Sequence, residues 1–259
     1  MTKIPFFQAD AFAERPLTGN PAAVMPLERW LDDAVMQAIA AENNLAEPAF
    51  TVPVERDDAD FDLRWFTPTV EIKMCGHATL ASAHILLRGE RVRFATPSGI
   101  LTVTRNGDLL DLDMLSAPVE PTRLPELLQA LGTEGETFLS RAGNGNAIVL
   151  VPGEAAVRSV RPDFTALAKL PYLVSVTAPG DTHDVASRVF AASYGIPEDP
   201  VTGSAHTALV PFWAQRLGRE SFTALQARPR TGVLHCRLAG DRVILGGRCA
   251  TVIVGDFRI

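Results

Sequence analysis

Hydrophobic and polar positions alternate over many short stretches of the chain, which is the pattern of antiparallel β-strands. Turn residues separate several of these stretches, and Asn106-Gly107-Asp108 and Ala239-Gly240-Asp241 predict tight hairpin turns. The predicted strands lie within residues 3–12, 20–27, 47–54, 60–68, 100–115, 146–153, 231–247 and 251–257.

Helical periodicity is confined to a few segments. Residues 27–44 are amphipathic and end at the polar pair Asn43-Asn44, which predicts a helix with one buried face. Residues 76–89 and 203–218 are apolar nearly all round and rich in alanine, which predicts buried helices. Because the regular strand-helix alternation of a parallel doubly wound sheet is missing, we do not expect that fold.

The two predicted buried helices lie in related sequences. When residues 69–89 are written above residues 194–218, Gly76 aligns with Gly203. Chance similarity of two alanine-rich helices is one explanation, and an internal repeat is the other. We favour the repeat and expect an α+β protein of two similar halves related by a pseudo-two-fold, each an antiparallel β-barrel-like sheet around a central α-helix.

The expected boundary between these halves follows from the position of the prolines. Residues 117–125 are proline-rich and predict a linker. We therefore expect one half at residues 1–118 and the other at residues 119–259. Whether the last strand, at about residues 250–259, returns to the first half is left open.

Composition narrows the classes of function. The chain has 259 residues, 47% of them hydrophobic, and a net charge of -6, which disfavours nucleic acid as a partner. It has neither a long apolar run nor an export signal, so we expect no membrane partner and a cytoplasmic location. Its three cysteines show no C-x-x-C spacing, and no cofactor motif or metal-ligand spacing is present, so we expect neither a cofactor nor a metal. A homodimer is left open.

Gly76 and Gly203 each open one of the predicted buried helices. A glycine there lets a ligand approach the backbone, and the free N–H groups of a first helical turn attract anions. If the two halves are related by a two-fold, both turns face the crevice between them. This arrangement predicts that Gly76 and Gly203 bind a small carboxylate.

Several segments resemble the hallmark motifs of the PhzF-like family of phenazine biosynthesis, whose fold is similar to that of diaminopimelate epimerase. The resemblance covers nearly the whole chain and is carried by DAFAERPLTGNPAAV (10–24), NNLAEPAF (43–50), RWFTPTVEIKMCGHATLASAHIL (64–86) and GIPEDPVTGSAHTAL (195–209). It implies two similar barrel halves, a site in the cleft, and cofactor-free isomerisation by proton transfer.

The resemblance also implies roles for individual residues. It places the catalytic glutamate at Glu47, the active-site histidine at His77, and the substrate-positioning aspartate and serine at Asp199 and Ser204. A carboxyl group screened from water suits this chemistry because it can both take and return a proton. We expect His77 to titrate near neutrality and to donate a hydrogen bond or relay a proton, and Ser204 with Gly203 to offer N–H groups to an anion.

The chain departs from the family pattern next to Glu47. The family usually shows Ser-Glu-Thr, whereas this chain has Ala46-Glu47-Pro48 and therefore lacks both hydroxyl groups. The motif therefore does not identify the hydrogen bonds that set the pKa of the Glu47 carboxyl group.

Cys75 stands directly before Gly76 and His77, and the repeat aligns it with Thr202. Since the second motif has no cysteine, two thiols cannot face each other as in two-base epimerases. We therefore expect Cys75 to be a compact residue of the turn, whose change to serine leaves catalysis nearly intact.

The predicted function is a cofactor-independent isomerase that moves a C–H proton on a small carboxylate-bearing metabolite through Glu47. One alternative is an amino-acid epimerase or racemase with a second base. Another is a ligand-binding or protein-interaction module without turnover.

Overall fold

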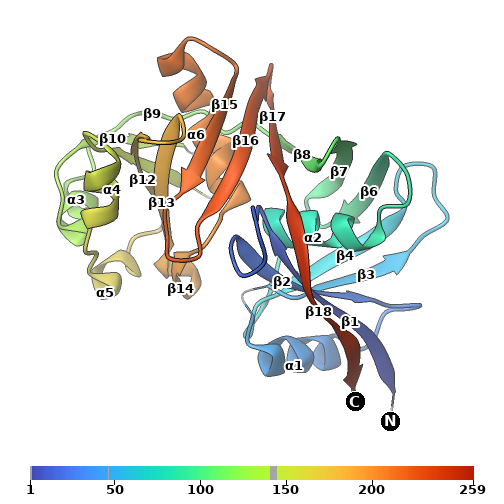
Figure 1. Cartoon of the computed structure of the whole chain (residues 1–259). Helices are drawn as coiled ribbons and strands as arrows, with labels where there is room; N and C mark the ends of the chain where they lie inside the picture. The colour runs from blue at the N-terminus through green and yellow to red at the C-terminus, as the bar shows by residue number, and fades with distance from the viewer. Residues whose placement is uncertain (1, 46, 141–144) are drawn as a thin grey trace. The chain divides into compact units, whose positions relative to one another are not determined.

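The computed structural model describes residues 2–45, 47–140 and 145–259, and the fold is mixed α and β with many strands and few helices (Figure 1). Unit 1 comprises Met1–Asp113 and Gly246–Ile259, and unit 2 comprises Met114–Leu245. The chain leaves unit 1 within β8 (Leu109–Leu115) and returns within β17 (Arg242–Gly247). The proline-rich segment 117–125 therefore lies inside unit 2, where β9 (Glu120–Pro121) pairs with β10 (Glu136–Leu139).

Unit 1 is built mainly of strands (Figure 1). Besides the start of β8 and the end of β17, its elements are β1 (Lys3–Ala11), β2 (Asn20–Pro26), α1 (Asp33–Asn43), β3 (Ala49–Pro53), β4 (Phe61–Phe66), β5 (Glu71–Ile72), α2 (Gly76–Leu86), β6 (Arg91–Thr96), β7 (Gly99–Asn106) and β18 (Cys249–Arg258). Strand β1 pairs antiparallel with both β18 and β2, which brings the two chain ends together. The later pairings are β2 with β3, parallel; β3 with β4 and β4 with β5, antiparallel; β4 with β6, parallel; and β6 with β7, antiparallel.

Unit 2 has the same order of strand pairings. Its remaining elements are α3 (Pro125–Leu131), β11 (Asn146–Leu150), α4 (Glu154–Ser159), α5 (Phe164–Leu167), β12 (Leu173–Pro179), β13 (Val185–Ala191), η1 (Ala192–Tyr194), β14 (Ile196–Asp199), α6 (Gly203–Leu217), β15 (Ser221–Gln226) and β16 (Gly232–Ala239). Strand β10 pairs antiparallel with β11, and β11 parallel with β12. Strand β12 pairs with β13 and β13 with β14, both antiparallel; β13 pairs parallel with β15, and β15 antiparallel with β16. Helix α2 thus lies in the chain between β5, which pairs antiparallel with β4, and β6, which pairs parallel with β4. Helix α6 lies in the same way between β14 and β15, which pair antiparallel and parallel with β13.

Small side chains explain why the two alanine-rich helices can be buried so completely. In α2, the residues from Gly76 to Ala83 are buried, and the helix packs against β1, β2, β3, β7 and β18 of its own unit. In α6, most residues from Gly203 to Ala214 are buried, and the helix packs against β11, β12 and β16. Both buried helices predicted from the sequence are therefore confirmed.

Helix α1 begins later than the amphipathic pattern predicts. The N–H group of Leu27 donates to the carbonyl of Thr51 at 2.8 Å, so the first residues of that pattern extend strand pairing instead of a helix. The helix ends as predicted, because Asn44 adopts a left-handed conformation with φ of 49°. Hairpin β7–β8 also forms at the predicted turn, with Gly107 at φ of +59°.

The hydrophobic core of unit 1 fixes the chain on both sides of Glu47. Met36 and Ile39 of α1 pack in one cluster with Phe50 of β3 and Phe66 of β4. The rings of Phe50 and Phe66 meet edge to face, with centroids 5.6 Å apart. The end of α1 and the start of β3 are thus held rigidly to the same core.

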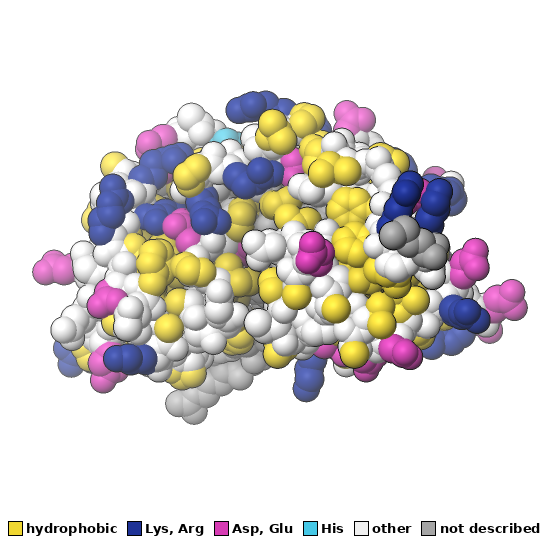
Figure 2. All heavy atoms as spheres, turned by 90° about the horizontal axis from the view of Figure 1, so that it is seen from below, with side chains coloured by type: hydrophobic (Ala, Val, Ile, Leu, Met, Phe, Trp, Pro, Cys, Tyr) yellow, Lys and Arg dark blue, Asp and Glu magenta, His cyan; other side chains and the backbone are white. Residues whose placement is uncertain are grey.

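The surface shows no segregation of charge on the face seen in Figure 2, where basic and acidic side chains are scattered among hydrophobic and uncharged ones. Among the residues that the structure describes, no helix is both long and apolar enough to cross a membrane.

Candidate active site

Glu47, Cys75 and His77 form a side-chain cluster in unit 1. Glu47 follows the end of α1 and precedes β3, whereas Cys75 occupies the N-cap position of α2 and His77 lies in the first turn of that helix. The Cys75 thiol donates to Oε2 of Glu47 at 2.9 Å, and His77 Nδ1 lies 3.5 Å from the same oxygen. The side chain of Glu47 is 16% exposed and that of His77 only 4%. The carboxyl group therefore stands at the edge of a largely buried polar cluster.

The amide of Asn20 orients the imidazole of His77. Asn20 opens β2 and is fully buried, and its Nδ2 donates to His77 Nδ1 at 3.2 Å. Because Nδ1 accepts this hydrogen bond, the proton of the neutral ring is on Nε2. Nδ1 is then an acceptor that faces both Asn20 and Glu47.

His77 does not titrate near neutrality, which corrects the prediction from sequence. Burial lowers its pKa to about 3, because desolvation disfavours the charged imidazolium. The 3.5 Å approach to Glu47 is therefore a contact of a neutral ring and not an ion pair at pH 7. His77 can accept or donate hydrogen bonds but does not carry a positive charge there.

Buried histidines also make stability depend on pH. Burial lowers the pKa of His206, on α6, to about 4. The histidines of the unfolded chain bind protons at about pH 6.5, whereas those of the folded chain bind them only near pH 3 to 4. The free energy of unfolding is therefore highest above pH 6.5 and falls as the pH is lowered below that value. Each histidine costs about 1.4 kcal/mol per pH unit within this window.

We therefore expect His206→Gln to show a shallower loss of unfolding free energy between pH 6.5 and 4.5 than the parent protein. Glutamine has no ionisable group but can still donate to the Thr202 carbonyl, which His206 Nδ1 contacts at 2.8 Å. Urea denaturation at a series of pH values measures the difference. Parallel slopes for the two proteins would contradict the assignment.

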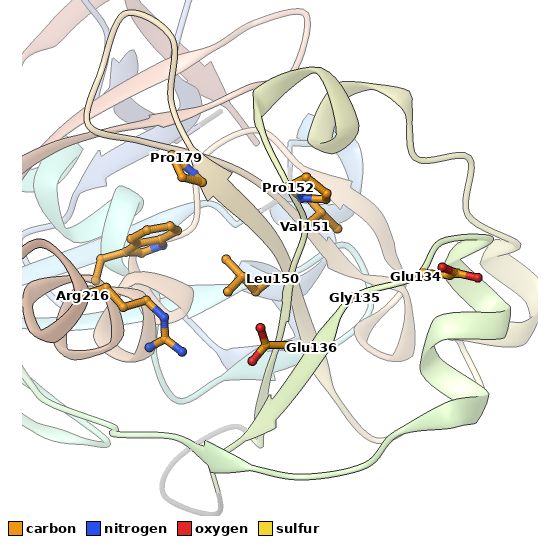
Figure 3. A pocket seen from close by; sticks show the side chains of 9 residues that line it. Glu134, Gly135, Glu136, Leu150, Val151, Pro152, Pro179 and Arg216 are labelled. Atoms are coloured by element: carbon orange, nitrogen blue, oxygen red, sulfur yellow. The ribbon is translucent and has the colours of Figure 1, made fainter.

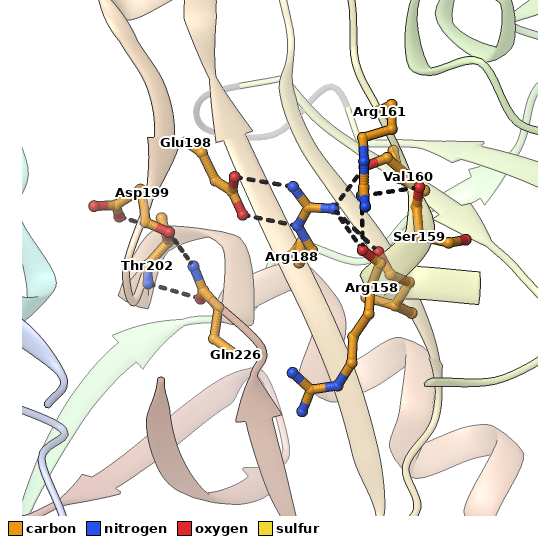
Figure 4. Close-up of polar contacts among 10 residues, drawn as sticks. Arg158, Ser159, Val160, Arg161, Arg188, Glu198, Asp199, Thr202 and Gln226 are labelled. Carbon is orange, nitrogen blue, oxygen red and sulfur yellow. Dashed lines mark hydrogen bonds and ion pairs between the residues drawn. The ribbon is translucent and has the colours of Figure 1, made fainter. Parts of the chain in front are cut away.

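A second polar group lies in unit 2 around Asp199, at the end of β14 (Figure 4). Asp199 is 6% exposed, and its Oδ2 accepts a hydrogen bond from Thr202 Oγ1 at 2.5 Å. The fully buried Gln226 of β15 joins both residues: its Nε2 donates to the Asp199 carbonyl at 2.8 Å, and its Oε1 accepts from the Thr202 N–H at 2.9 Å. This network fixes the carboxylate and the start of α6 together.

Each unit holds the strand before its buried helix with a paired arginine and glutamate. In unit 2, Arg188 of β13 makes two hydrogen bonds to Glu198 of β14, at 2.8 and 3.0 Å, next to Asp199 (Figure 4). In unit 1, Arg64 of β4 makes the same bidentate pair with Glu71 of β5, with both distances 2.7 Å. The glutamates of the two pairs stand four residues before Thr202 and Cys75, which occupy the N-cap positions of α6 and α2.

The predicted site residues thus fall into two groups. Glu47, Gly76 and His77 belong to unit 1, where Gly76 is the first residue of α2. The residues predicted in the other half, Asp199, Gly203 and Ser204, belong to unit 2, where Gly203 is the first residue of α6. Ala46 lies outside the described residues, and its neighbour Pro48 is buried.

Sequence reasoning gave no role to Asn20, Thr202 or Gln226, nor to the contact of Cys75 with Glu47. Asn20 stands within one of the motifs that carry the family resemblance, and the repeat aligned Thr202 with Cys75. The sequence therefore contained an indication that each of these two residues belongs to a site. Gln226 had none, because it ends an ordinary strand pattern, SFTALQ.

A hollow in unit 2 has a volume of about 570 Å3 and is lined by Leu150, Pro179, Trp213 and Arg216 among others (Figure 3). Its described lining residues include none of the predicted site residues. The guanidinium of Arg216 stacks on the Phe212 ring at 3.6 Å and donates to the Phe212 carbonyl, which gives it a structural contact.

Comparisons with known proteins agree with the resemblance seen in the motifs. A sequence model of the family described as phenazine biosynthesis-like protein (PhzC-PhzF) matches residues 9–255. An uncharacterized isomerase of Pseudomonas aeruginosa is 47% identical, with 99% of each chain covered. The crystal structure of a PhzF-family phenazine biosynthesis protein from Enterococcus faecalis superimposes over 100% of both chains with a TM-score of 0.92 and 42% identity. A predicted epimerase of Pseudomonas aeruginosa has a TM-score of 0.79 and 25% identity, covering 98% of this chain and 99% of its own.

Proposed function

Since the chain belongs to the PhzC-PhzF family of phenazine biosynthesis-like proteins and is an isomerase, we propose that it moves a C–H proton on a small carboxylate-bearing metabolite through Glu47, without a cofactor. The observation that carries this proposal is the position of Glu47 Oε2, 2.9 Å from the Cys75 thiol and 3.5 Å from His77 Nδ1. A group that takes and returns a proton must be stable in both of its protonation states.

The cluster offers a partner to each state of Glu47. When Glu47 is a carboxylate, Oε2 accepts a hydrogen bond from the Cys75 thiol. When Glu47 is protonated, its O–H can donate to Nδ1 of the neutral His77 in place of the Asn20 amide, because this nitrogen has a single lone pair. The 3.5 Å separation shortens as the proton is taken, as catalytic contacts tighten when substrate binds.

For the remaining residues we propose roles in binding. Gly76 and Gly203 open α2 and α6, and each of these first turns, taken by itself, offers free N–H groups that can attract a carboxylate. Ser204 stands beside Gly203 and adds a hydroxyl donor. Asp199, held by Thr202 and Gln226, accepts a hydrogen bond from a hydroxyl or ammonium group of the substrate.

We also propose that each unit is a barrel-like sheet around its alanine-rich helix. The matching order of strand pairings supports this arrangement, as does the packing of α2 and α6 against several strands of their own units.

An epimerase or racemase is the second candidate, favoured by the similarity to a predicted epimerase at 25% identity. The two reactions share proton removal at carbon but differ in outcome. Inversion of a stereocentre would identify the epimerase, whereas a double bond or proton moved to another carbon would identify the isomerase.

The proposal predicts incorporation of deuterium. The purified protein is incubated in heavy water with a panel of small cyclic and amino-acid carboxylates, and each compound is followed by proton NMR and mass spectrometry. We expect one class to gain deuterium at carbon, because a proton taken by Glu47 exchanges with solvent before its return. Product formation without deuterium uptake would contradict proton transfer through a solvent-exchanging carboxyl group. A bound compound that neither changes nor exchanges would point to a binding module.

A further inference from the structure

The fold brings together three side chains whose spacing in the sequence predicts no metal site. One potential ligand atom each from Glu47, Cys75 and His77 lies within 4.8 Å of the other two. The closest separations are 2.9 Å from Sγ to Oε2, 3.5 Å from Sγ to Nδ1 and 3.5 Å from Nδ1 to Oε2. We propose that this cluster binds a single Zn²⁺ ion, which blocks the catalytic glutamate.

The separations fit tetrahedral coordination. With metal–ligand bonds of about 2.0 to 2.3 Å, ligand atoms at the corners of a tetrahedron stand roughly 3.3 to 3.7 Å apart. Two of the three observed separations have this length. The third opens by roughly half an ångström when the thiol gives up its proton and its hydrogen bond to Glu47.

The ligand set favours zinc over magnesium and calcium. A thiolate and an imidazole suit Zn²⁺, whereas Mg²⁺ and Ca²⁺ prefer oxygen atoms alone. Cys75 and His77 are buried at the start of α2, so the helix holds two of the ligands close together before metal arrives. The ion takes the Nδ1 lone pair that otherwise accepts from Asn20, so the Asn20 amide gives up that hydrogen bond. Glu47 keeps a partly exposed side chain, which gives the ion a path from solvent.

Three protein ligands leave the fourth position to water or to a carboxylate of the substrate. The inhibitory consequence rests on the proposed function, because a zinc ion on Oε2 occupies the oxygen that would take the proton. Zinc binding itself does not depend on that function and is measured without any substrate.

The test compares zinc binding of the parent protein with that of two cysteine variants. Zinc affinity is measured by competition with a chromophoric chelator, and Co²⁺ replaces Zn²⁺ to report thiolate ligation by its near-ultraviolet charge-transfer absorption. Cys75→Ser removes a ligand. Cys249→Ser is the matched control, because this thiol lies in the same unit but contacts the Leu80 carbonyl at 3.8 Å instead of the cluster.

We expect one equivalent of zinc to bind the parent protein and the Cys249→Ser variant equally, with loss of at least about a hundredfold in affinity for Cys75→Ser. Cobalt should show the thiolate band in the first two proteins alone. Equal affinity in parent and Cys75→Ser, or a cobalt complex without the band, would overturn the proposal. If Cys75→Ser does not fold, Glu47→Gln provides the same test, since a carboxamide is a poor zinc ligand.

Different outcomes would contradict the zinc site and the catalytic role of Glu47. If zinc binds through Cys75 but deuterium uptake by substrate continues at full rate, the zinc site stands and Glu47 is not the base. If zinc does not bind while Glu47→Gln abolishes deuterium uptake, the catalytic role stands and the zinc site is wrong.

Discussion

Replacement of Glu47 by glutamine should lower the rate of deuterium uptake by at least about a hundredfold, the usual effect of removing a general acid or base. Glutamine keeps the size of the side chain and can still accept a hydrogen bond from Cys75, but it cannot take a proton from carbon at neutral pH. The measurement is the initial rate of deuterium wash-in at one pH, with the fold checked by circular dichroism.

Two variants make this result specific. Glu42→Gln, an exposed residue of α1, removes one carboxylate outside the cluster and should leave the rate unchanged. Cys75→Ser should keep most of the activity, because a serine hydroxyl can donate to Glu47 as the thiol does. If the folded serine variant were as inactive as Glu47→Gln, the thiol and not the carboxyl group would be the base.

The Arg188→Met variant should lose about 3 kcal/mol of unfolding free energy. The Arg188 and Glu198 side chains are only 12% and 13% exposed, so removal of the arginine leaves a carboxylate with little access to water. The guanidinium also donates to the Val160 carbonyl at 2.8 Å, and this acceptor loses its partner too. Urea denaturation at pH 7 measures the loss.

Arg56→Met provides the matched control for this prediction. Arg56 pairs with Asp62 at 3.0 Å, but the two side chains are 45% and 31% exposed. Pairs that remain in water contribute less than about 1 kcal/mol, so this variant should unfold nearly as the parent does. Equal losses in the two variants would show that burial does not set the strength of the Arg188–Glu198 pair.

The elements that the sequence predicted well are those set by local pattern. The two alanine-rich helices and the turn at Gly107 follow from residues only a few positions apart, and the structure contains all three. The late start of α1 was missed because it depends on Thr51, which lies 24 residues beyond Leu27 and captures its N–H group. Pairing between distant strands overrides helical periodicity there.

The sequence by itself determined the family and the motif positions, since these need only the order of residues. It placed Glu47 at an element junction and His77 in a first helical turn, and both lie there. Only the tertiary structure decided which atoms meet, because Asn20, Glu47 and Cys75 are far apart along the chain and are joined by strand pairing. It also decided the charge of His77, because the pKa of an imidazole depends on how much water surrounds it, and burial by neighbouring strands is a property of the fold.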